Sequence, residues 1–103
     1  MSASGFVAVL VIDLHFPEAE SLKSKRKELS SLKAHLRGRL GASVAEVDHQ
    51  DTWQRAAVAV AVVAADHRHV RDVLEEVERF VAAAADVELF DVIVTWVDLE
   101  DGS

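Results

Sequence analysis

Polar and aromatic side chains gather in one short segment of the chain, with Asp48, His49, Asp51 and Trp53 inside six positions. Carboxylates and an imidazole could bind a divalent cation, and an exposed Trp can anchor a partner protein. Glu46 would complete a metal-ligand set. In a strand, however, Glu46 and Asp48 share one face while His49 points to the other. We therefore expect no metal here. Asp48 and Asp51 should cap the turn, with Trp53 packed over the sheet edge or exposed to a protein partner. A metal-binding or enzymatic site at Glu46, Asp48, His49 and Asp51 is the minor alternative.

The motifs of nucleophilic catalysis are missing from the sequence. It contains no Cys and no Tyr, and no Ser stands in a Gly-x-Ser-x-Gly elbow. Its four glycines are scattered and form no phosphate-binding loop. We therefore expect a non-enzymatic protein with no catalytic residue and no cofactor. The absence of Cys suits a cytoplasmic protein, and no apolar run reaches the ~20 residues needed to span a membrane.

Positive charge is confined to one segment of an acidic chain. The net charge is −7, which argues against DNA binding and against general affinity for nucleic acid. Residues 1–40 nevertheless carry +3, because seven Lys and Arg residues lie between positions 23 and 39. Residues 41–103 carry −10. Any contact with a polyanion must therefore be local and oriented.

The basic segment coincides with a predicted helix whose leucines recur at helical spacing. Cations crowd its first two turns, where the helix dipole favours acids, at a cost of about 0.3–1 kcal/mol each. Arg26, Lys33 and Arg37 line one flank of this helix. We interpret Lys25, Arg26, Lys33 and Arg37 as candidate contacts for RNA phosphates or another partner. The alternative is a solvated face, with Lys25 extended toward solvent or paired with an acid of the polar segment.

The hydrophobic patterns predict six elements in the order β-α-β-β-α-β, within a single domain of residues 1–103 with its core at about 6–99. The predicted strands cover residues 6–14, 43–49, 54–65 and 87–99, and the helices cover residues 22–40 and a segment that starts after Asp66. Ser21 and Asp66 are candidate N-caps, and Gly41 is suited to end the first helix. This order is that of the ferredoxin-like α+β fold, a four-stranded antiparallel sheet with two helices on one face.

Three of the predicted strands are apolar on both faces. Since the helices can cover only one face, the helix-free face should carry an apolar patch, and such patches mark interfaces. We expect a homodimer through this face and assign Val60 and Trp96 to the interface. The alternative is that the tail or a loop covers the patch. The third strand, AAVAVAVV, has no aromatic residue, which disfavours base stacking on the sheet.

Three sequence blocks together resemble the bacterial YlxP-like family, which is domain of unknown function 503. They are SLKSKR at residues 21–26, SVAEVDHQDTWQRA at 43–56 and VAVVAADHRHV at 60–70. The resemblance implies a small ferredoxin-like protein. The genes of this family tend to lie beside those for translation initiation and ribosome maturation factors. It therefore implies a role near the ribosome, with a ribosomal subunit or ribosomal RNA as a possible partner, and it supplies no catalytic residues.

Overall fold

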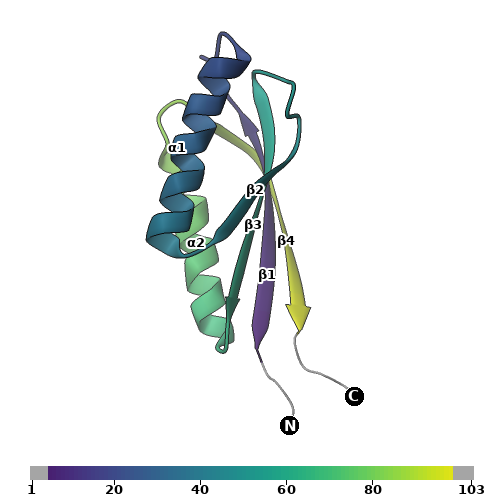
Figure 1. Cartoon of the computed structure of the whole chain (residues 1–103). Helices are drawn as coiled ribbons and strands as arrows, with labels where there is room; N and C mark the ends of the chain where they lie inside the picture. Colours follow the sequence, from purple (N-terminus) through teal and green to yellow (C-terminus); the bar gives the residue numbers. More distant parts are fainter. Residues whose placement is uncertain (1–4, 99–103) are drawn as a thin grey trace.

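A computed structural model describes residues 5–98 and has the predicted order of elements (Figure 1). The elements are β1 (Phe6–His15), α1 (Leu22–Leu40), β2 (Ser43–Asp48), β3 (Arg55–Ala64), α2 (His67–Ala83) and β4 (Glu88–Asp98). The four strands form one antiparallel sheet in the order β2-β3-β1-β4. Both helices lie on the same side of it (Figure 1). The ferredoxin-like fold expected from the sequence is therefore confirmed.

Local side-chain chemistry defines where the helices begin and end. Ser21 and Ser24 form a reciprocal capping box at the start of α1, each hydroxyl accepting from the other residue's backbone N–H. Gly41 follows the last turn with a φ of 66°, a left-handed conformation that glycine adopts without steric cost. At the start of α2 the Asp66 carboxylate accepts from the backbone N–H of Arg68. All three predicted boundary residues are confirmed.

The core lies between the helices and one face of the sheet. Leu10 of β1 pairs with Val60 of β3, and both are fully buried. The helices contribute the apolar side chains spaced three or four residues apart on their inner faces, which are Leu29, Leu32 and Leu36 from α1 and Val70, Leu74, Val77 and Val81 from α2. Val60 therefore belongs to the helix-covered core. Its assignment to an interface on the helix-free face is wrong, because its side chain points to the other side of the sheet.

The helix-free side of the sheet is apolar, as the sequence predicted. We call this surface the open face and define it by Val7, Val9, Val11, Ala59, Ala61, Val63, Ile93 and Val97. Its members are partly or largely exposed in the described structure. A charged cluster bounds it at one end, where the Arg55 guanidinium lies 3.0 Å from Asp13 and His15 lies 3.5 Å from Glu88.

Trp96 does not belong to the open face either. It pairs with the buried Ala8, so its side chain projects toward the helix side of the sheet. There it stacks on His67 at the start of α2, with ring centroids 4.3 Å apart. Trp96 remains partly exposed because β4 is the outermost strand. The predicted interface role of Trp96 thus needs a different surface from the one the sequence suggested.

Candidate functional site

Lys25 anchors α1 to the hairpin formed by β2 and β3. Its side chain is fully buried, and its Nζ lies 2.9 Å from the Glu46 carboxylate. The ammonium also donates to the carbonyls of His49 at 2.9 Å, Arg55 at 3.1 Å and Gln50 at 3.5 Å. An ammonium has three N–H donors, so this environment satisfies it completely. This one side chain therefore links the start of α1 to both ends of the β2–β3 turn.

The prediction that Lys25 contacts RNA is wrong, because none of its surface is accessible to a partner. The alternative drawn from the sequence, pairing with an acid of the polar segment, is the arrangement found. The same contact occupies Glu46, the residue that would have completed a metal-ligand set. Among residues 5–98, no group of three or more His, Cys, Asp or Glu side chains is placed to hold a metal ion.

The polar segment forms the tip of the β2–β3 hairpin. His49 has a φ of 63°, a conformation that costs a residue with a side chain about 1–2 kcal/mol. The Lys25 ammonium and the backbone N–H of Thr52 both donate to the His49 carbonyl and hold this bend. Asp48 caps the turn, since its carboxylate accepts from the backbone N–H of His49 at 2.7 Å. Hydrogen bonds that involve Lys25, Thr52 and Asp48 therefore define the bend at the tip.

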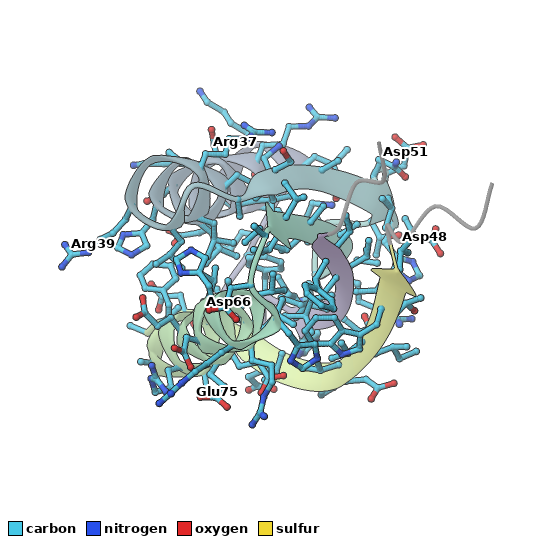
Figure 2. The ribbon with its side chains drawn as sticks, turned by 90° about the horizontal axis from the view of Figure 1, so that it is seen from below. Arg37, Arg39, Asp48, Asp51, Asp66 and Glu75 are labelled. Carbon is cyan, nitrogen blue, oxygen red and sulfur yellow. The ribbon has the colours of Figure 1, made fainter. Side chains whose placement is uncertain are left out.

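The four predicted partner-binding residues all lie on this tip. Asp48, Asp51 and Trp53 are exposed, whereas His49 is half-buried. Figure 2 shows Asp48 and Asp51 on the opposite side of the molecule from Arg39 on α1 and Glu75 on α2. The structure thus brings the predicted residues together on one accessible loop.

The exposed surface of α1 is strongly basic. Five of its cations are exposed and Lys33 is half-buried; the exposed ones are Lys23, Arg26, Lys27, Arg37 and Arg39. Glu28 is the one acid within the helix. Figure 2 shows Arg39 projecting outward from the helix layer. By contrast, α2 carries four acids and three arginines.

Within this basic surface, Arg26, Lys33 and Arg37 form a line beside the sheet edge. The Arg37 guanidinium donates to the backbone carbonyl of Val44 on β2. This contact places Arg37 beside β2, the outer strand on that side of the sheet. Arg26 and Lys33 share the same flank of α1, so the whole flank borders β2. Arg37 is therefore partly engaged within the protein, while Arg26 remains exposed and Lys33 is half-accessible. Of the four predicted contact residues, Arg26 and Lys33 are therefore the most available to a partner.

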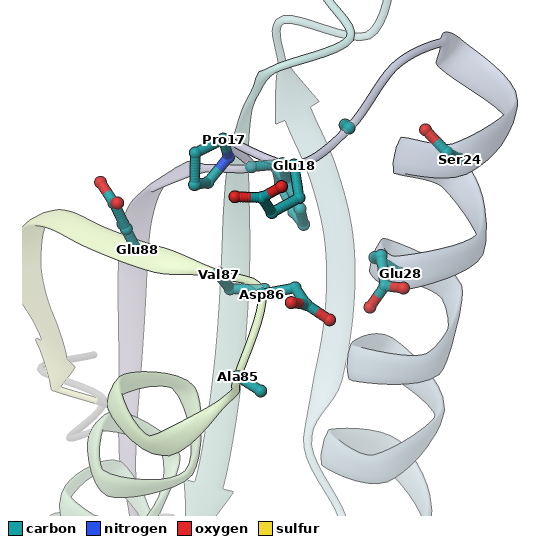
Figure 3. A pocket seen from close by; sticks show the side chains of 10 residues that line it. Pro17, Glu18, Ser24, Glu28, Ala85, Asp86, Val87 and Glu88 are labelled. Atoms are coloured by element: carbon teal, nitrogen blue, oxygen red, sulfur yellow. The ribbon is translucent and has the colours of Figure 1, made fainter.

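An acidic pocket at one end of the molecule was not foreseen from the sequence. It has a volume of about 580 Å³ and lies between the loop after β1, the start of α1 and the connection from α2 to β4 (Figure 3). Glu18, Glu28, Asp86 and Glu88 contribute carboxylates to its lining, and no Lys or Arg does. These acids come from two segments that are far apart along the chain, residues 18–28 and 86–88, so their spacing gave no signal that the fold would gather them.

Comparison with known proteins places this geometry in a family. The model of a family described as "Protein of unknown function (DUF503)" matches residues 7–94, which include both helices, the hairpin and most of β4. The chain belongs to the DUF503 family. It is also 30% identical over 71 residues to the "Uncharacterized protein YlxP" of Bacillus subtilis (strain 168), covering 69% of this chain and 77% of that protein.

The DUF503 fold also resembles a solved structure of unrelated sequence. A "De novo designed protein Foldit4" superimposes with a TM-score of 0.54 over 89% of this chain and 96% of its own, at 14% identity. A likeness at this identity shows the fold alone. The chemistry of this DUF503 chain must therefore be argued from its own surfaces. Of the described residues, no helix is both long and apolar enough to cross a membrane.

Proposed function

We propose that this protein is a non-enzymatic cytoplasmic binding module that contacts a phosphate backbone through the exposed side of α1, in translation or ribosome maturation. The observation that carries the proposal is the charge of that surface, where five exposed cations surround a single acid. Lys and Arg side chains that neutralise phosphates release counterions and supply sequence-independent affinity. The family resemblance, with its implied setting among translation factors, supports ribosomal RNA as the polyanion.

The acidic remainder of the chain makes such a contact directional. Residues 41–103 carry a net charge of −10, so other surfaces are repelled by a polyanion. A module of this kind touches RNA with one side and turns the rest of its surface outward. Ribosomal subunits, which expose RNA beside protein, suit such a one-sided ligand better than free RNA does.

The test is co-sedimentation of the full chain with purified ribosomal subunits across a salt series. The double variant Arg26→Glu and Lys33→Glu should weaken binding and reduce the slope of log affinity against log salt by about 2. A matched control, Arg68→Glu with Arg79→Glu, changes the net charge equally on α2. If the two double variants behave alike, binding depends on overall charge and the α1 surface is not the contact.

A second candidate function rests on the open face. A continuous apolar surface on a soluble chain marks an interaction site, and Val63 on this face is 66% exposed. We infer that the protein acts as a homodimeric structural or regulatory module, with the hairpin tip available to a protein partner. The solution molar mass from light scattering tests this function. A mass of 11.3 kDa at every concentration would exclude it.

A further inference from the structure

The exposed apolar side chains of the described residues are concentrated on one strand. Eight large hydrophobic side chains are exposed, and five of them belong to β4, namely Phe90, Ile93, Val94, Trp96 and Val97. They project to both sides of the sheet. Ile93 and Val97 lie on the open face, whereas Val94 and Trp96 lie on the helix side. A partner resting on the open face would cover only the first pair, while a partner along the strand edge would cover both.

The outer edge of β4 has no neighbour among residues 5–98. β4 pairs with β1 on one side and is the last strand of the sheet on the other. It is eleven residues long. Its first half carries Glu88, Asp91 and a bulge at Phe90 in the pairing with β1, whereas the following run VIVTWV at residues 92–97 is regular and contains no charge, no Gly and no Pro. Proteins normally protect edge strands with such residues, because an uncovered edge presents free N–H and C=O groups to another strand.

The opposite edge of the sheet, β2, is protected in several ways. It has six residues and an irregularity between Glu46 and Asp48 that interrupts its pairing with β3. Both of these residues are acidic, and Arg37 already donates to the Val44 carbonyl. Because β2 is protected in these ways, we do not expect β4 to pair with β2 of another molecule. Such head-to-tail pairing would propagate into a filament. The protection of β2 leaves β4 as the one edge in the described sheet suited to pairing.

A hollow beside β4 offers room for the side chains of an added strand. It has a volume of about 290 Å³ between α2 and β4. Leu74, Val94 and Trp96 supply its apolar lining, and Arg71, Glu75 and Glu78 of α2 line it as well. His67 stacks on Trp96 at one end. The helix-side residues of a strand placed next to β4 would enter this hollow, while its other residues would extend the open face.

We propose that β4 pairs antiparallel with β4 of a second copy, joining two four-stranded sheets into one of eight strands. The inference rests on the self-association proposed above and specifies where the second copy binds. A two-fold axis between identical strands requires antiparallel pairing, which matches this all-antiparallel sheet. The net charge of −7 makes two copies repel, so the uncharged run of β4 is the surface where close approach costs least.

The size of the contact predicts a reversible dimer. Eleven residues at about 3.4 Å each give a strip about 37 Å long, and with a sheet depth of about 10 Å it covers on the order of 400 Å² per copy. Stable complexes bury about 800 Å² per partner. The dimer should therefore dissociate on dilution, so its detection requires a concentration series.

The experiment combines light scattering with amide hydrogen exchange on the full chain. We expect the molar mass to rise with concentration toward twice 11.3 kDa, and no further. Over the same range, alternate amides along β4 should exchange more slowly, because their N–H groups become bonded to the second copy. The variant Val94→Lys should abolish the dimer. Ala61→Lys, at the centre of the open face and two strands from the β4 edge, should leave it intact.

Three results would overturn the inference. A monomer at all concentrations removes both the edge pairing and the homodimer proposed earlier. In a second outcome, Ala61→Lys abolishes the dimer and the β4 amides stay unprotected. The second copy then lies on the open face, so the proposed homodimer stands and the edge pairing fails. A mass that grows beyond the dimer means that the association is not closed by a two-fold axis. The exchange measurement uses the unmodified protein and remains decisive even if Val94→Lys fails to fold.

Discussion

Both faces of the sheet carry runs of apolar residues, but the two faces differ in environment. Val62 and Val63 are neighbours on β3, yet Val62 is 6% exposed beneath the helices and Val63 is 66% exposed on the open face. The residue type is the same, so composition does not explain the difference. Each strand presents two apolar faces and the two helices cover only one of them. The sheet therefore retains apolar surface for which the described chain supplies no cover.

The largest expected effect separates a core position from an exposed one. Val60→Glu buries a carboxylate without a partner, and we expect the chain to lose its cooperative fold. Ile93→Glu places the same group where the native side chain is largely exposed, so the chain should stay folded. Circular dichroism with thermal unfolding measures both. A folded Val60→Glu variant would mean that the helices do not cover the face described above.

A smaller effect is expected at the one charged side chain buried among residues 5–98. Lys25→Met keeps an apolar stem but leaves Glu46 and three carbonyls without their ammonium, and breaking a buried charge pair costs about 3–5 kcal/mol. Lys27→Met is the matched control, because Lys27 is exposed on the same helix. Urea unfolding at one protein concentration compares them. Equal midpoints would show that the ammonium does not hold the hairpin.

The smallest effect tests the two faces with one conservative change. Val→Thr preserves shape and adds a hydroxyl. We expect Val62→Thr to lower the free energy of unfolding by about 1–3 kcal/mol, because the new hydroxyl is buried at an apolar position without a hydrogen-bond partner. Val63→Thr should stay within about 0.5 kcal/mol, since its hydroxyl meets water. Chemical denaturation in the dilute range, where self-association is weakest, measures the pair. A similar loss at Val63 would indicate that the open face is covered in solution.

Much of the fold could be predicted because its signals are local. Helical spacing of leucines, a serine before α1 and a glycine after it each depend on a few neighbouring residues, and all are found where expected. The pairing of Lys25 with the hairpin was only one of three possibilities, beside a partner contact and a side chain extended toward solvent. Its partners lie 21 to 30 residues away along the chain, and the sequence could not decide whether the side chain turned inward or outward.

The assignment of Val60 and Trp96 to an interface on the helix-free face was the main error, and a signal against it existed. Asp13 and His15 at the end of β1 have the parity of Val7, Val9 and Val11, so polar residues already marked that face as the accessible one. Val60 and Trp96 pair with Leu10 and Ala8, which have the opposite parity, so both project toward the helix side of the sheet.

The sequence by itself determined the order of elements, their caps and the surplus of apolar strand surface, because each depends on residues close together in the chain. The tertiary structure alone decided which strand face the helices cover, that Lys25 is enclosed, and that acids from two distant segments line one pocket. It also left β4, apolar on both sides, at an edge with no described neighbour. These outcomes depend on how crossovers bring distant segments together, and no local pattern encodes that arrangement.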